Sequence, residues 1–174
     1  MARIRKGCSY RRLERPYTRK SKYKKMNFVG MTPSPIVVRY DMGDPKKKFE
    51  YTLNLITKDS LQIRQNAIES ARQTSNRLLE KNLGKNDYYF KIRIYPHHHL
   101  RENPLASGAG ADRMSTGMQL SFGKVIGIAA QVKKGQTLME LSVDREHLAL
   151  AKKALHRAVY KIPCSCSIQE VHNK

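Results

Sequence analysis

Hydrophobic and polar residues alternate in several short segments in the first half of the chain. Residues 36–40, 49–55 and 89–95 each show this alternation. A strand with one buried face places every second side chain in the core, so each of these segments predicts a strand. In the third segment the second face carries Lys91 and Arg93 between tyrosines, which favours contact with solvent or RNA.

The second half of the chain contains a longer apolar run. Residues 125–132 are almost continuously apolar, which predicts a central strand. The turn at 133–135 separates this run from the alternating residues 137–143, and the two together predict a β-hairpin. Weaker alternation over 165–171 predicts a last strand.

Two segments place apolar residues at helical spacing. The first is expected to follow an N-cap at Asp59 and to end at Gly84, with Glu69 and Arg72 off its apolar stripe. The second is expected to follow an N-cap at Asp144 and to end at Pro163. The first stripe is Leu61, Ile68, Ala71, Ser75, Leu78 and Leu79; the second is Leu148, Ala151, Leu155, Ala158, Val159 and Ile162.

This order of elements predicts an α+β fold, a two-layer sandwich of a mixed, mainly antiparallel sheet with two helices on one face. We expect a single domain over residues 33–174, preceded by a basic N-terminal extension over residues 1–32. Residues 97–118 have neither a helical nor a strand period. A loop of more than about 15 residues in a compact domain is usually functional or disordered, so this segment is a functional candidate.

The charge of the chain narrows the class of partner. The 174 residues include 34 Lys and Arg against 14 Asp and Glu, a net charge of +20. A compact protein with this charge repels itself unless a polyanion neutralises it, and nucleic acid is the expected polyanion. The sequence contains no apolar run long enough to span a bilayer and no apolar signal-peptide core, so a membrane role is not expected.

The N-terminal segment concentrates this charge. Residues 1–25 hold eleven basic residues and one acid, Glu14. The segment has too little apolar area to fold alone, so we expect it to become ordered on RNA, the alternative being a solubilising tail. Tyr10, Tyr17 and Tyr23 are interleaved with the cations and are expected to stack on bases. The basic residues are Arg3, Arg5, Lys6, Arg11, Arg12, Arg15, Arg19, Lys20, Lys22, Lys24 and Lys25.

Further cations lie on other predicted elements. Lys91 and Arg93 are expected on a strand, Lys124 before the apolar run, and Arg101 and Arg113 in the long loop. The polar face of the second helix is expected to carry Lys152, Lys153, Arg157 and Lys161. A structured RNA could contact all of them, whereas the chain lacks the helix-turn-helix or zipper pattern of a reader of double-helical DNA.

Metal and catalytic sites are not expected. His97, His98 and His99 are adjacent, and neighbouring side chains of an extended segment point to opposite sides. Cys164 and Cys166 are one residue apart, without a second pair to complete a zinc site, and Cys8 leaves the thiol count odd. The acids are scattered, so no nucleophile or carboxylate pair suggests an enzyme, and no cofactor is expected.

The stretch 89–124, YFKIRIYPHHHLRENPLASGAGADRMSTGMQLSFGK, carries a more specific signal. Together with the opening MARIRKGCSYRRLERPYTRKSKY, it closely resembles the archaeal and eukaryotic large-subunit ribosomal protein family called L-ten-e, the counterpart of bacterial L-sixteen. The GQTLMEL segment and the KIP ending of the second helix also fit, so the resemblance covers essentially the whole chain. Eukaryotic members carry a longer carboxy-terminal extension, whereas this chain stops at Lys174, and this difference favours an archaeal source.

The resemblance implies a structural constituent of the cytoplasmic large ribosomal subunit that binds ribosomal RNA (rRNA) with its tail, residues 2–25. It implies neighbouring ribosomal proteins as partners, without homo-oligomers, and an internal loop close to transfer RNA (tRNA) near the peptidyl transferase centre. A non-ribosomal RNA-binding protein or RNA chaperone is the alternative, and a nuclease or RNA-modifying enzyme is the rival from another class. The implied tRNA-proximal residues are Arg101, Ser107, Gly108, Ala109, Gly110, Ala111, Asp112, Arg113, Met114, Gly117 and Met118.

Overall fold

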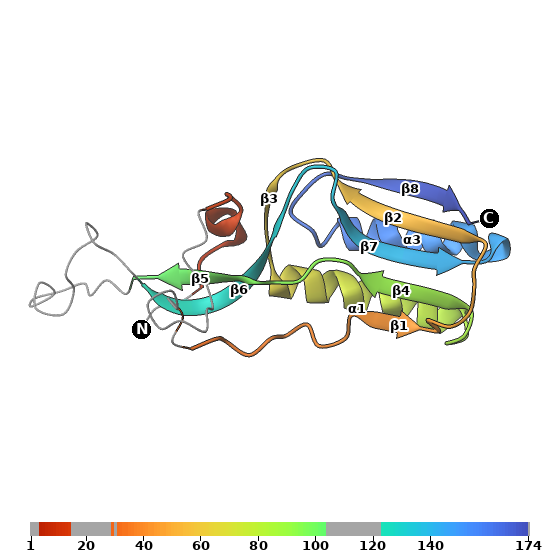
Figure 1. Cartoon of the computed structure of the whole chain (residues 1–174), viewed down its shortest axis with the longest axis horizontal. Helices are drawn as coiled ribbons and strands as arrows, with labels where there is room; N and C mark the ends of the chain where they lie inside the picture. The colour runs from red at the N-terminus through yellow and green to blue at the C-terminus, as the bar shows by residue number, and fades with distance from the viewer. Residues whose placement is uncertain (1–3, 15–28, 30, 104–122, 174) are drawn as a thin grey trace, which may run out of the picture.

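The structure of the chain is a computed structural model that describes residues 4–14, 29, 31–103 and 123–173 (Figure 1). Its described strands form two sheets, and two α-helices accompany them. The elements are the 3-10 helix η1 (Gly7–Tyr10), β1 (Asp41–Gly43), β2 (Tyr51–Thr57), β3 (Leu61–Arg64), α1 (Gln65–Asn82), β4 (Tyr88–Ile92), β5 (His98–Glu102), β6 (Lys124–Val132), β7 (Thr137–Val143), the 3-10 helix η3 (Arg145–His147), α3 (Leu148–Val159) and β8 (Cys166–His172).

The larger sheet has the strand order β1-β4-β7-β2-β8, and α1 and α3 lie together against one of its faces (Figure 1). The two helices contact each other, and the Ser75 hydroxyl donates a hydrogen bond of 2.9 Å to the Ala154 carbonyl between them. The main core fills the space between sheet and helices, with Leu53, Phe90, Leu141 and Leu155 fully buried. The burial of alternate residues of β2 and β4 confirms the predicted one-sided strands.

The smaller sheet has the order β3-β6-β5 and extends from one end of the body (Figure 1). The predicted α+β class, with two helices on one face of a sheet, is confirmed. The expected single, mixed sheet is instead divided in two, and each strand pairing among the described residues is antiparallel.

The predicted hairpin of residues 125–132 and 137–143 is wrong, because its two strands belong to different sheets. β6 lies between β3 and β5, whereas β7 lies between β4 and β2. The turn between them, with Gly135 at φ +82°, is held by the end of β2: the Gly135 N–H donates to the Thr57 carbonyl and the Thr57 N–H to the Gln136 carbonyl. The chain therefore changes sheet at this turn. A short turn signal indicates a reversal of direction but does not specify the strand partners.

The predicted start of the first helix is also wrong. Residues 61–64 form β3, which pairs with β6, and Ile63 is fully buried there. The helix begins only at Gln65, and Asp59 lies in the preceding turn, where its carboxylate accepts a 3.4 Å hydrogen bond from the Ser165 N–H. From Ile68 to Leu79 the predicted apolar stripe is buried as expected.

The second helix is preceded by η3, and Asp144 makes no side-chain capping bond there. Its carboxylate instead lies 3.1 Å from the Lys47 ammonium group. α3 then ends at Val159, four residues before Pro163. Residues 166–172 form the predicted last strand, β8.

The predicted strand at 36–40 is extended chain beside the sheet, and the strand β1 begins only at Asp41. Val37 is 2% exposed, whereas Val38 is 76% exposed, so the buried face is the opposite of the one predicted. Two hydrogen bonds hold this segment: the Ile36 N–H donates to Gln65 Oε1, and the Ile92 N–H donates to the Tyr40 carbonyl, each over 2.9 Å.

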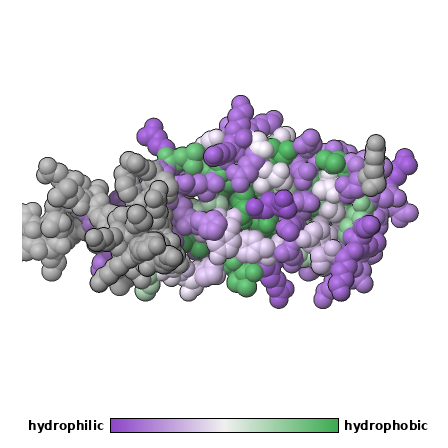
Figure 2. Space-filling model, in the orientation of Figure 1, coloured by the Kyte–Doolittle hydropathy of each residue, from purple (hydrophilic) through white to green (hydrophobic). Residues whose placement is uncertain are grey.

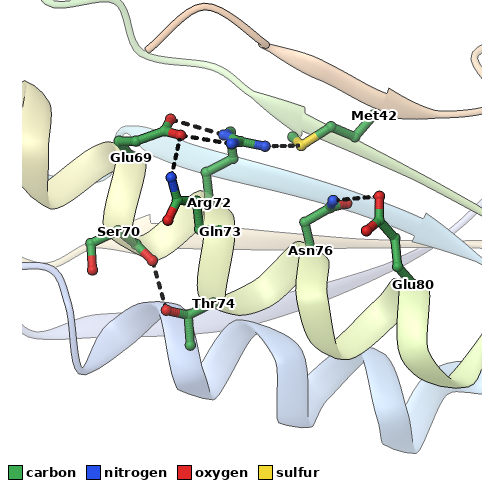
Figure 3. A network of polar contacts seen from close by, with 8 residues as sticks. All are labelled: Met42, Glu69, Ser70, Arg72, Gln73, Thr74, Asn76 and Glu80. Atoms are coloured by element: carbon green, nitrogen blue, oxygen red, sulfur yellow. Dashed lines mark hydrogen bonds and ion pairs between the residues drawn. The ribbon is translucent and has the colours of Figure 1, made fainter. Parts of the chain in front are cut away.

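A polar network lies along α1, and Arg72 links it to Met42 of β1 (Figure 3). The Arg72 guanidinium donates two hydrogen bonds to Glu69, of 2.9 and 2.6 Å, and a third to Met42 Sδ. This guanidinium is the main reason that the pKa of Glu69 lies below its usual value. The pairing also explains how Glu69, predicted to lie off the buried stripe, is only 9% exposed.

Candidate RNA interface

Residues 4–14 cross the smaller sheet and are fixed to it mainly through backbone atoms. Gln62, which is 2% exposed, donates from its side-chain amide to the Tyr10 and Arg12 carbonyls over 3.2 and 2.7 Å. Its backbone N–H donates to the Arg11 carbonyl over 2.9 Å, and Arg64 donates to the Arg5 carbonyl over 3.1 Å. Because backbone carbonyls make these contacts, the basic side chains are left to point elsewhere.

Tyr10 anchors this segment. Its ring is 6% exposed and packs with Leu100 and Ala129 in a small second core. Its hydroxyl donates a 2.9 Å hydrogen bond to Glu102, and burial raises its pKa. A buried ring cannot stack on a base, so the prediction that Tyr10 stacks on RNA does not fit the structure. The expectation that the tail becomes ordered only on RNA does not fit residues 4–14, which pack on the smaller sheet.

The basic side chains of the docked segment face outward. Lys6, Arg11 and Arg12 are exposed, and Arg5 is exposed while its guanidinium lies 3.2 Å from Glu102. The segment therefore presents several cations at fixed positions on one end of the molecule. The remaining predicted tail residues lie outside the described residues: Arg3, Arg15, Tyr17, Arg19, Lys20, Lys22, Tyr23, Lys24 and Lys25.

The predicted cations of the large sheet lie on β4 and just beyond it. Lys91 lies 3.6 Å from Asp41 and Arg93 3.5 Å from Glu140, so a carboxylate neighbours each of them. Both side chains remain at least a third exposed, which leaves them accessible to a phosphate. Exposed ion pairs contribute little stability, roughly 0–1 kcal/mol, so an RNA phosphate can compete for these cations.

Two further predicted residues lie on the hairpin of β5 and β6. Lys124 is exposed at the start of β6 and is paired in register with Glu102. Arg101 belongs to β5. The prediction of a loop from residue 97 is therefore wrong for residues 98–102, because these residues pair with β6. Its side chain is partly buried, and burial lowers its pKa. The other predicted loop residues, Ser107 to Met118, lie outside the described residues.

The sequence analysis did not single out a groove of about 300 Å³ on the helical layer, lined by Gln73, Thr74, Arg77 and Arg157. Arg77 belongs to α1 and Arg157 to α3, and both are exposed. Within the described ranges neither guanidinium has an ion pair. Two guanidinium groups at one groove suit a phosphate diester. Helical spacing placed Arg157 on the polar face of its helix, but only the packing of α1 on α3 brings it to Arg77.

The histidines and cysteines show no arrangement for a metal in the described part of the chain. His98 and His99 are 7% and 5% exposed on adjacent positions of β5, and burial is the main reason for the lowered pKa of His98. Cys164 and Cys166 have their sulfur atoms 3.5 Å apart. Hydrogen bonding from Cys166 lowers the pKa of Cys164 to about 7.

The described residues place exposed cations on the docked segment, on the larger sheet and on the helices, and they form no catalytic cluster. Comparison with known proteins gives it a family. The family model described as ribosomal protein L16p/L10e matches residues 16–169. The chain belongs to this family of ribosomal proteins.

Curated relatives agree with this assignment. The large ribosomal subunit protein uL16 of Methanococcus maripaludis is 45% identical over 166 residues, which cover 95% of this chain and 92% of the relative. The uL16 protein of Methanococcus aeolicus has the same identity and coverage. That of Archaeoglobus fulgidus is 44% identical over 159 residues, covering 91% of this chain and 88% of the relative. The predicted resemblance is thus confirmed, with relatives in archaea.

Hydrophilic side chains cover most of the described surface seen in Figure 2. None of the helices in the described ranges is long and apolar enough to cross a membrane.

Proposed function

We propose that this chain is a structural, non-catalytic constituent of the large ribosomal subunit that binds large-subunit rRNA. The observation that carries the proposal is the identity of 45% over 95% of the chain to proteins named for the large ribosomal subunit. The basic side chains of residues 4–14 support it, because their backbone is already fixed when RNA arrives. Preorganised cations lose less conformational entropy on binding than those of an unfolded tail.

The affinity for RNA then depends on phosphate contacts, and a test follows from their salt dependence. Each neutralised phosphate contributes about 0.7–0.9 to the slope of log affinity against log salt concentration. Replacing Lys6, Arg11 and Arg12 together by Gln should lower this slope by roughly 2–3. The folded body should be unaffected, because this segment contacts the body through backbone carbonyls, the Tyr10 side chain and the Arg5 guanidinium.

A matched control removes the same charge elsewhere. Lys46, Lys48 and Lys85 are exposed in the loops that follow β1 and precede β4, away from the docked segment. Their triple replacement by Gln should change the slope less than the tail variant. An equal loss in both variants would mean that net charge alone governs binding and would refute specific presentation by residues 4–14. No measurable rRNA binding by the unaltered protein would refute the proposed function itself.

The internal segment is proposed to support tRNA positioning near the peptidyl transferase centre. This rests on the resemblance of residues 101–118 to the family's loop, and residues 104–122 lie outside the described part. Deletion of residues 107–116 should leave subunit association intact and impair tRNA binding by the assembled ribosome. Loss of thermal stability in the isolated variant would instead mark the segment as structural.

The protein is further proposed to act as a single copy among neighbouring ribosomal proteins. Sedimentation of the purified chain should therefore give a monomer, and a stable dimer would contradict this part of the proposal.

A further inference from the structure

A cavity lies between two extended segments that meet at the base of the smaller sheet. It has a volume of about 530 Å³ and is bounded by residues 32–35 on one side and 95–99 on the other. Pro33, Pro35 and Pro96 supply apolar walls, and Ile128 of β6, which is 3% exposed, also lines it. Sites of a few hundred Å³ with mostly apolar walls suit a small planar ligand.

The wall formed by residues 95–97 is aromatic. The Tyr95 ring is stacked on Tyr40, with centroids 5.4 Å apart and an interplanar angle of 25°. The His97 ring also lies near Tyr95, with centroids 4.5 Å apart and an interplanar angle of 47°. Tyr40 thus holds the plane of Tyr95 in place, yet Tyr95 is 49% exposed. A fixed, exposed ring is what base stacking requires, because little side-chain freedom is lost on binding.

The cavity also has a polar edge. The Thr32 hydroxyl and His99 Nε2 lie 3.3 Å apart, and both residues line the cavity. A hydroxyl both donates and accepts hydrogen bonds, and an imidazole nitrogen does either according to its tautomer. The pair can therefore exchange hydrogen bonds with the edge of a nucleobase that stacks on the rings.

A cation stands next to these rings. Arg93 and Tyr95 lie two positions apart just after β4, and both are exposed, so they share a face. His97 is also exposed, and its ring contacts Tyr95. The Arg93 guanidinium is half exposed beside Glu140. A guanidinium followed by two rings fits a nucleotide, whose phosphate and base lie close together. In a chain of net charge +20, this favours RNA over a peptide as the occupant.

We propose that this cavity takes up one unpaired base of the RNA, which stacks on Tyr95 and His97 and meets Thr32 and His99 at its edge. The inference rests on the proposed function, since it assigns a base-binding site to a protein that otherwise contacts phosphates. The tail cations then supply the salt-dependent part of the affinity, and the cavity supplies a part that does not depend on salt.

The test compares Tyr95→Ala with the unaltered full-length chain for binding to purified large-subunit rRNA over a series of salt concentrations. Loss of one stacked base should weaken binding by about tenfold at every salt concentration. The salt slope should stay unchanged, because an aromatic ring releases no counterions. Tyr95→Phe keeps the ring and should bind like the unaltered chain. Tyr160→Ala removes a tyrosine that is 85% exposed on the helical layer and serves as the matched control.

Ultraviolet crosslinking of the same complexes followed by mass spectrometry reads the contact directly, and a nucleobase should be attached at Tyr95 or His97. Thermal unfolding of each variant checks that the fold is retained. Equal rRNA affinity of Tyr95→Ala and the unaltered chain, without a crosslink at this wall, would overturn the cavity proposal and leave the proposed function standing. Absence of rRNA binding by the unaltered chain would instead overturn the proposed function.

Discussion

Tyr10 joins the basic N-terminal segment to the folded body, so its removal should release that segment. Complete burial of a tyrosine removes about 150–250 Å² from water, worth roughly 4–6 kcal/mol at 25 cal/mol per Å² as an upper limit. The ring is 6% exposed, and its hydroxyl also bonds to Glu102. Since neighbouring side chains relax around the space that is left, we expect Tyr10→Ala to weaken docking by about 3 kcal/mol.

Limited proteolysis measures this docking. Trypsin cleaves after Arg11 or Arg12 only when the segment leaves the sheet, because the carbonyls of both residues accept hydrogen bonds from Gln62. When opening is fast relative to cleavage, the cleavage rate follows the open population. A change of 3 kcal/mol should therefore accelerate cleavage on the order of 100-fold.

Two variants frame this prediction. Tyr10→Phe keeps the ring and loses only the hydroxyl contacts, so its cleavage should accelerate by about tenfold, as expected for one hydrogen bond to a charged group. Tyr160→Ala should leave cleavage unchanged, because this side chain is exposed. If Tyr10→Ala were cleaved no faster than the unaltered chain, Tyr10 would not anchor the segment and the reasoning would be refuted.

Three further predictions concern the body. Glu69→Gln should cost roughly 1.5–3 kcal/mol of unfolding free energy at neutral pH, by weakening the bonds to Arg72. Because folding lowers the pKa of Glu69, the ionised carboxylate contributes its full stability above the unfolded pKa, near 4.3, and this contribution fades as pH falls through the folded pKa. The unfolding free energy of the variant, measured with urea, should therefore depend less on acid pH than that of the unaltered chain. An unchanged pH profile would contradict the prediction. Gly43→Ala should lower the unfolding free energy by more than about 2 kcal/mol, since φ is +88° and the new Cβ would meet the Tyr88 carbonyl oxygen. Gly135→Ala, at φ +82° in open space, should cost only about 1 kcal/mol. Equal losses of stability in thermal unfolding would argue against the clash at Gly43. Replacing Arg77 and Arg157 by Gln should reduce the salt slope of rRNA binding by up to about 2 if the groove holds phosphates, and an unaltered slope would exclude it from the interface.

Local sequence patterns correctly predicted the features that depend on one face of a single helix or strand. The apolar stripe of α1 from Ile68 to Leu79 and the alternation of β2 both follow from side-chain spacing, and the structure buries them as expected. The family could also be predicted, because motifs such as GAGADR are specific in themselves.

Strand partners could not be predicted in this way. β3 and β5 are short and join β6 from distant parts of the chain, so residues 61–64 read as helix and 98–102 as loop. Their alternation is too brief to outweigh the patterns on either side. Long-range backbone pairing decided these elements, as it decided that β6 and β7 belong to different sheets.

For function, the sequence by itself determined the family, the excess of positive charge and its concentration near the N-terminus. Only the tertiary structure decided which groups remain available to RNA. It buries Tyr10 as an anchor, stacks Tyr95 on Tyr40, and brings Arg77 to Arg157. The physical reason is that charge and composition add along a chain, whereas exposure depends on what packs against each side chain, and in all three cases the partner is distant in sequence.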